Sequence, residues 1–183
     1  MNILVTKSIF RTAFVLLVVT APLVVHAQQA PAKPPASPCV SLPQYNQLDF
    51  WVGEWDVKQP EKETGPSVGS SKIEKLMGSC VIQENWESQG FTGKSWNFYD
   101  QGMSKWRQIW IDVTGRKGEM SGEYRDGGMR LEGETIQPGG RKVKTRMVFL
   151  NLAAGKVRQT AERSTDEGKT WTTTVDFIYL KKS

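Results

Sequence analysis

From Phe50 onward, polar and apolar residues alternate with a period of two, and turn residues recur about every ten positions. The breaks carry turn-forming residues, as in Asp126-Gly127-Gly128 and Pro138-Gly139-Gly140. This pattern predicts strands and leaves no segment for a long amphipathic helix. The ten predicted strands span residues 50–58, 71–77, 80–88, 94–99, 105–113, 117–124, 129–136, 143–150, 156–163 and 170–181.

Short, evenly spaced strands joined by tight turns are typical of an antiparallel barrel or a sandwich. Successive hairpins favour the up-and-down barrel, because closure removes the exposed edges of the sheet. We therefore expect an all-β fold: an antiparallel up-and-down barrel of about ten strands. A short helical turn is expected before it, over residues 41–49, where Leu42, Tyr45 and Leu48 recur every three positions. Ser41 suits its cap and Pro43 its first turn.

The N-terminus has the three-part pattern of a secretory signal peptide. Lys7 and Arg11 precede an apolar run over residues 13–25, and Val25-His26-Ala27 supplies the cleavage site. The run is shorter than the roughly 20 apolar residues of a membrane span. We expect residues 1–27 to be a signal peptide cleaved near Ala27, residues 28–40 a Pro/Ala-rich disordered leader, and residues 41–183 the barrel domain. The mature chain, with no integral membrane segment, would then be periplasmic or secreted.

Charge argues against nucleic acid as a partner. Removal of Lys7 and Arg11 with the signal peptide lowers the formal charge from +5 to +3. The remaining charges alternate in sign, as in Glu61-Lys62-Glu63, and form no basic block.

Cysteine and histidine usage narrows the chemistry. An oxidising compartment favours a disulfide between Cys39 and Cys80, although two unpaired thiols are the alternative. His26, the single histidine, would leave with the signal peptide. Nucleophile–histidine pairs, ordinary zinc sites and a proximal-histidine haem site are therefore not expected in the mature chain, and we predict no metal and no cofactor.

Three of the predicted strands mix aromatic and polar residues on one face. Residues 105–113 align Trp106, Gln108, Trp110 and Asp112, while Glu84 aligns with Trp86, and Asn97 with Tyr99. A filled small barrel would turn Val, Ile and Leu inward. The mixture indicates a lumen that holds something polar and flat, or water. The alternative is that these faces point outward and the aliphatic faces form a packed core.

Phe50-Trp51-Val52-Gly53-Glu54-Trp55 contains Gly-x-Trp directly after the helical turn, and this resembles the N-terminal signature of lipocalins and related calycin barrels. Further matching stretches, over residues 78–86, 95–100, 106–112 and 157–171, resemble an exported bacterial lipocalin-like family of unknown function. The resemblance implies that Trp55 plugs the closed end of the barrel and that Gly53 lets the chain turn into the first strand. A related branch binds haem through a histidine, a ligand that the mature chain is not expected to offer.

Residues 164–171 match the Asp-box pattern, Ser-x-Asp-x-Gly-x-Thr-Trp. We interpret the motif as a staple for a turn. Asp166 bonds backbone amides, Gly168 takes a left-handed conformation and Trp171 packs beneath.

The pattern as a whole favours non-covalent binding of a small, partly apolar and unidentified ligand. Glu84, Asn97 and Gln108 would orient it, and four aromatic residues would stack on it: Trp86, Tyr99, Trp106 and Trp110. One alternative is a lyase, isomerase or hydrolase that uses Glu84 or Asp112, with burial raising the pKa of each carboxyl. Simpler roles for these two are a Glu84–Arg107 ion pair and an Asp112 turn cap. The other alternative is a ligand-free structural or interaction module.

Overall fold

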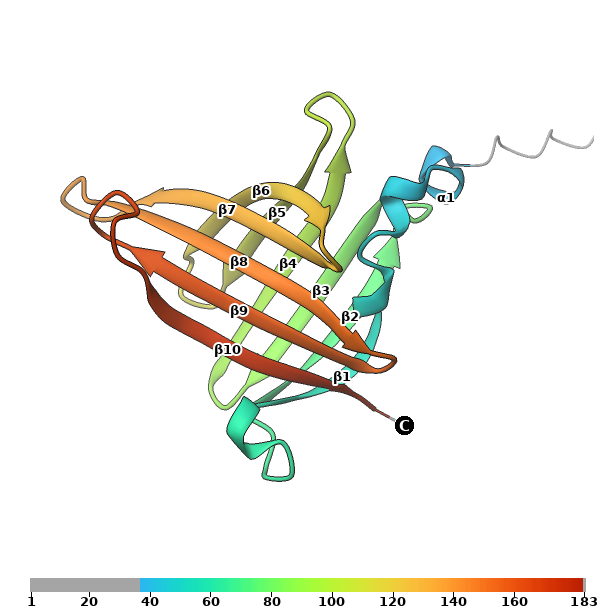
Figure 1. Ribbon diagram of the computed structural model, residues 1–183, viewed down its shortest axis with the longest axis horizontal. Helices are drawn as coiled ribbons and strands as arrows, with labels where there is room; N and C mark the ends of the chain where they lie inside the picture. The colour runs from blue at the N-terminus through green and yellow to red at the C-terminus, as the bar shows by residue number, and fades with distance from the viewer. Residues whose placement is uncertain (1–36, 183) are drawn as a thin grey trace, which may run out of the picture. The chain divides into compact units, whose positions relative to one another are not determined.

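A computed structural model describes residues 37–182, which form a closed barrel of ten antiparallel strands (Figure 1). The all-β up-and-down fold is therefore as predicted. The strands are β1 Gly53–Lys58, β2 Gly69–Leu76, β3 Val81–Ser88, β4 Phe91–Asp100, β5 Lys105–Asp112, β6 Lys117–Arg125, β7 Gly128–Ile136, β8 Lys142–Ala153, β9 Lys156–Ser164 and β10 Thr172–Lys181.

Each strand pairs with its neighbours in sequence, and β1 pairs with β10 to close the barrel. The closing register sets Trp55 opposite Lys181 and Val57 opposite Tyr179. Side chains alternate across the sheet, so each register fixes which residues face the lumen.

Two strands begin at least two residues later than their period-two pattern predicts. β1 begins at Gly53 rather than Phe50, because Asp49–Trp51 forms a 3-10 helix, η2. β10 begins at Thr172 rather than Thr170, because Thr170 still belongs to the preceding turn and donates its backbone N–H to Asp166.

The expected helical turn consists of three short pieces: α1 Pro38–Ser41, η1 Pro43–Asn46 and η2. They lie at the right-hand end of the barrel in Figure 1, opposite the tips of the β7–β8 and β9–β10 hairpins. A further 3-10 helix, η3 Pro60–Lys62, lies between β1 and β2. Of the expected leader, the structure describes residues 37–40, and Pro38–Val40 form part of α1. The predicted signal peptide lies outside the described residues.

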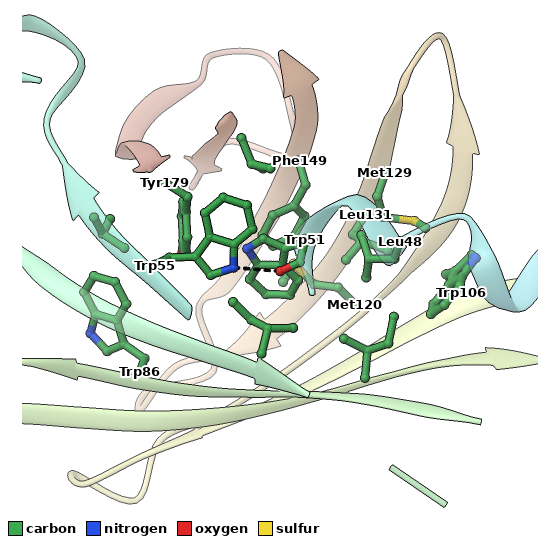
Figure 2. Packing of buried hydrophobic residues seen from close by; sticks show 14 residues of the cluster. Leu48, Trp51, Trp55, Trp86, Trp106, Met120, Met129, Leu131, Phe149 and Tyr179 are labelled. Carbon is green, nitrogen blue, oxygen red and sulfur yellow. Dashed lines mark hydrogen bonds between the residues drawn. The ribbon is translucent and has the colours of Figure 1, made fainter. Parts of the chain in front are cut away.

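Aromatic side chains close the barrel at the helical end (Figure 2). Trp51 and Trp55 are fully buried, and the Trp55 indole N–H donates to the Trp51 carbonyl over 2.8 Å. The Trp51 ring also lies 4.5 Å from that of Phe149. Gly53, between the helix and the strand, has a φ of +143°, which favours glycine. Trp51 and Trp55 therefore close this end of the barrel together, whereas the motif assigned that role to Trp55 alone.

A disulfide joins Cys39 to Cys80, as predicted, and ties α1 to the residue before β3. Cys39 is buried. Within residues 37–182, no helix is long and apolar enough to cross a membrane.

Candidate functional site

A cavity of about 840 Å³ occupies the half of the barrel away from the helices. Side chains from β3 to β10 line it, and apolar groups supply most of the wall. Its mouth lies among the β5–β6, β7–β8 and β9–β10 turns, where Arg116, Pro138 and Arg163 reach the lining. The barrel is therefore not filled throughout.

The mixed faces of β3, β4 and β5 point inward, as the lumen interpretation predicts. Glu84, Asn97 and Gln108 are each no more than 3% exposed. Their neighbours of opposite parity, such as Arg107 and Ile109, face away and are more exposed. The alternative with an aliphatic core and outward-facing polar residues is excluded for these strands.

Glu84 is the centre of a buried hydrogen-bond network. The Ser71 hydroxyl donates to its Oε1 over 3.0 Å, and the Ser95 hydroxyl donates to its Oε2 over 3.1 Å. The Tyr179 hydroxyl lies 3.3 Å from Oε1 and also donates to Oε1 of Gln159 over 2.7 Å. Four strands therefore meet at one carboxyl group, with no ion pair to it in the described residues.

Burial raises the pKa of the Glu84 carboxyl to about 7, because desolvation penalises its charged form. The hydrogen bonds from Ser71, Ser95 and Tyr179 only partly offset this penalty. Burial also raises the pKa of the Tyr179 phenol well above its usual range, and the nearby carboxylate adds to that effect. The proposed Glu84–Arg107 pair does not form: Arg107 faces out toward Asp100 and Glu119.

A second chain of polar contacts leads away from Glu84. The Asn97 amide donates to the Ser95 hydroxyl over 3.0 Å, and the Gln108 amide donates to Oδ1 of Asn97 over 2.9 Å. Glu84 and Gln108 line the cavity, whereas Asn97 stands behind them and also donates to the Ile82 carbonyl. Asn97 thus holds the two cavity-lining groups in place.

Aromatic rings form part of the wall. Trp86 and Phe177 stack with centroids 5.5 Å apart and an interplanar angle of 12°. Trp110 lies across Gly93 of β4, where an added Cβ would come within 2.2 Å of Cζ2 of Trp110. Trp86, Trp110 and Phe177 all line the cavity.

Tyr99 and Trp106 do not line this cavity, contrary to their predicted stacking role. They share the inward parity of Gln108 but lie nearer the helical end of the barrel. The Trp106 indole donates to Gln47 over 2.9 Å, and Tyr99 packs edge-on against Tyr45. Both therefore pack beneath the helical segment.

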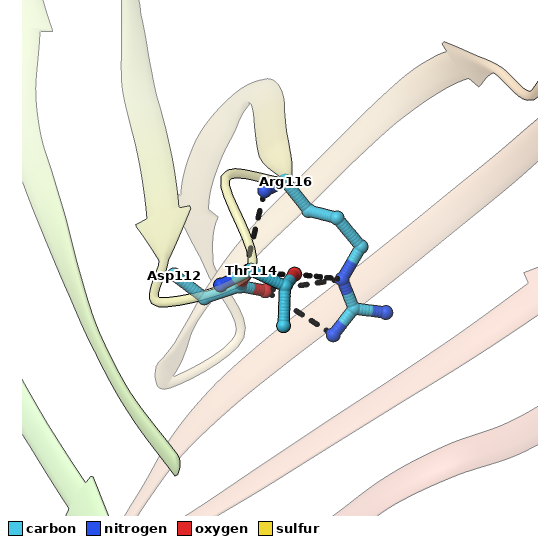
Figure 3. Close-up of polar contacts among 3 residues, drawn as sticks. All are labelled: Asp112, Thr114 and Arg116. Atoms are coloured by element: carbon cyan, nitrogen blue, oxygen red, sulfur yellow. Dashed lines mark hydrogen bonds and ion pairs between the residues drawn. The ribbon is translucent and has the colours of Figure 1, made fainter.

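Asp112 lines the mouth of the cavity, but its carboxyl group has a lowered pKa and not the raised pKa expected of a catalytic acid (Figure 3). The Thr114 hydroxyl and backbone N–H both donate to its Oδ1, and the Arg116 guanidinium lies 3.2 Å from its Oδ2. The hydrogen bond from the Thr114 hydroxyl is the largest cause that lowers the pKa of the Asp112 carboxyl. The expectation of a raised pKa was wrong for Asp112; the turn-cap interpretation describes it.

The Asp-box residues hold the β9–β10 turn. The Thr170 backbone N–H donates to Asp166, and the Gly168 N–H donates to Ser164 over 2.8 Å. Gly168 has a φ of +95°, and the Trp171 indole donates to its carbonyl over 3.1 Å. These contacts have the form of a turn staple.

Sequence reasoning missed most of the residues that line the cavity, among them Gln159, Arg163, Phe177 and Tyr179. The period-two pattern of β9 and β10 could have placed residues of both strands on the inner face. Val157, Gln159 and Ala161 lie on one face of β9, and Phe177 and Tyr179 lie on one face of β10. The sequence alone does not say that β10 closes on β1, the pairing that sets Tyr179 beside Val57.

Within residues 37–182, no group of three or more His, Cys, Asp or Glu side chains is placed to hold a metal ion. No family model matches the chain, and no curated protein matches it in sequence. The lipocalin-like resemblance therefore stays a prediction, and the function has to be argued from the cavity.

Proposed function

We propose that this chain is an exported binding protein that takes up a small, partly apolar molecule in the lumen of its barrel. The observation that carries the proposal is the cavity of about 840 Å³ with its largely apolar wall and few polar groups. This size and make-up are typical of sites for small molecules.

The disulfide supports the export part of the proposal. Disulfides persist in oxidising compartments such as the periplasm and the extracellular space. The Cys39–Cys80 bond fits that environment. The sequence pattern of residues 1–27 independently predicts secretion.

Native mass spectrometry of the protein, expressed with residues 1–27 and purified gently from the cell envelope of its own host, tests this function. We expect a chain that begins at Gln28, two hydrogens light, with extra mass that disappears on denaturation. The extra mass would identify the ligand. A bare protein that also fails to enhance the fluorescence of apolar dyes would overturn the binding function.

A second candidate function is acid–base catalysis on a molecule in the same cavity. It is favoured by Glu84, whose carboxyl lines the cavity and has its pKa raised by burial to about 7, near the optimum for a general acid or base. Once the ligand is known, Glu84→Gln separates the two functions. Loss of turnover with retained binding would support catalysis; no turnover by the unaltered protein would leave binding alone.

A further inference from the structure

Among residues 37–182, the charged side chains at the mouth of the cavity form ion pairs, with one exception. Arg116 binds Asp112 at 3.2 Å, and Lys117 binds Glu119 at 2.8 Å. Arg163 also lines the cavity, but none of the described acidic side chains lies within ion-pair distance of it. A positive charge at the mouth is therefore left without a partner from the described part of the chain.

Two polar side chains that line the cavity, Gln159 and Gln108, each have a hydrogen-bonding group without a strong partner. Within the described part of the chain, the Gln159 amide N–H₂ donates only to Sδ of Met147, a weak acceptor 3.3 Å away. Oε1 of Gln108 has no hydrogen-bond partner among residues 37–182, although its amide nitrogen is bonded to Asn97. Both residues line the cavity, so one donor and one acceptor are available there to a guest molecule.

The separation between these two features follows from the strand. Gln159 and Arg163 lie on the same face of β9, four residues apart. At the usual rise of a β-strand, this corresponds to about 13 Å. Apolar groups, including Trp86, Met147 and Phe177, line the cavity together with them.

We infer that the ligand is an amphiphilic monoanion: an acid whose negative head binds Arg163 at the mouth, with an apolar body and a hydroxyl group at its inner end. The carboxylate of the ligand supplies the negatively charged partner that Arg163 lacks among the described residues. A hydroxyl group both accepts and donates, so it can bond either to the Gln159 amide N–H₂ or to Oε1 of Gln108. The buried apolar wall accommodates the chain between the two ends. This inference rests on the proposed binding function and names its ligand class.

Three probe molecules separate the parts of the inference: 12-hydroxydodecanoate, dodecanoate and 1,12-dodecanediol. Isothermal titration of the disulfide-bonded protein measures each Kd. We expect 12-hydroxydodecanoate to bind the most tightly. Loss of the head-group charge in the diol, or of the hydroxyl in dodecanoate, should each weaken binding, by about tenfold and about threefold respectively.

Two variants test which residue binds each end of the ligand. Arg163→Gln should weaken binding of both acids about tenfold and leave the diol unchanged. Arg141→Gln, which alters an exposed arginine in the β7–β8 turn that does not line the cavity, is the matched control. Gln159→Met should remove the preference for 12-hydroxydodecanoate over dodecanoate. Gln108→Met provides the same test if the first variant does not fold, as judged by circular dichroism.

An equal effect of Arg163→Gln on the acids and the diol, or no effect on the acids, would overturn the inference. So would failure of all three probes to bind to the unaltered protein. In that case native mass spectrometry still decides the binding function separately, because a bound molecule of another class would preserve that function while removing this ligand assignment.

Discussion

The Tyr179 hydroxyl oxygen lies 3.3 Å from Oε1 of Glu84, although 95 residues separate them in the chain. The same hydroxyl donates its single hydrogen to Gln159 over the shorter distance of 2.7 Å. When Glu84 is neutral, its own proton is available for the Tyr179 contact. When Glu84 ionises, Tyr179 has to turn its hydrogen from Gln159 to the carboxylate. We therefore expect ionisation of Glu84 to weaken the hydrogen bond between Tyr179 and Gln159.

The first prediction concerns the pH dependence of stability. The pKa of Glu84 is about 7 in the folded protein, above the ordinary value of 4.5 expected for the unfolded chain. The folded state therefore binds more protons between these values, so the free energy of unfolding falls as pH rises through this window. The contribution is complete below pH 4.5 and is lost above about pH 7, a change of about 3 kcal/mol.

Glu84→Gln has no such proton to lose. Its free energy of unfolding, relative to the unaltered protein, should therefore rise by about 3 kcal/mol between pH 4.5 and pH 8, as measured by urea denaturation. Glu87→Gln alters an exposed glutamate on the same strand and is the control. Parallel pH profiles for the Glu84→Gln and unaltered proteins would contradict the prediction.

The second prediction is that Tyr179→Phe raises the pKa of Glu84 further. The hydrogen bond from Tyr179 stabilises the ionised carboxylate and is one of the contacts that offset burial. Its removal should shift the titration of Glu84, followed by NMR of the side-chain carboxyl carbon, to a higher pH. A shift to lower pH would show that Tyr179 favours the neutral acid instead.

Sequence alternation predicted the ten strands and favoured the inward facing of β3, β4 and β5 over the outward alternative. It could not predict depth along the barrel. Trp106 and Gln108 share one face of β5, yet Gln108 lines the cavity and Trp106 packs under the helical segment. Parity selects the side of a sheet, whereas depth depends on where the plug ends.

Two other features of the site, the Tyr179–Glu84 contact and the environment of Asp112, could not be predicted from the strand pattern. Tyr179 reaches Glu84 because β10 closes the barrel on β1, a pairing that no local pattern specifies. Asp112 stands at the last position of β5, where the following turn brings Thr114 and Arg116 back to its carboxylate. The type of residue identified both carboxyls as candidates, but burial raises the pKa of Glu84, whereas the hydrogen bonds of the turn lower the pKa of Asp112.

The third prediction concerns the Cys39–Cys80 disulfide, which closes a loop with a sequence separation of 41 residues. Restriction of the unfolded chain by a loop of this length stabilises the fold by about 3–4 kcal/mol. Reduction, or the double substitution Cys39→Ser with Cys80→Ser, should lower Tm in scanning calorimetry. The serine variant treated with reductant is the control and should not change further. An equal Tm for the oxidised and reduced protein would contradict a stabilising role.

The last prediction concerns the fit of Trp110 against Gly93. A Cβ added to Gly93 would lie 2.2 Å from Cζ2 of Trp110, so Gly93→Ala forces the indole to move. Overpacking of this kind costs about 1–3 kcal/mol in the free energy of unfolding. Because Trp110 lines the cavity, the displaced ring should also change the tryptophan emission and the affinity for apolar dyes.

Gly118 provides a matched control on the opposite side of the same tryptophan. A Cβ added there would lie 3.9 Å from Cβ of Trp110, an ordinary van der Waals distance. Gly118→Ala should therefore leave emission and dye affinity close to those of the unaltered protein. If Gly93→Ala also leaves both unchanged, Trp110 has room to move without altering the cavity, and its ring does not define the wall at that point. If only Gly93→Ala changes them, the position of the indole sets the shape of the cavity.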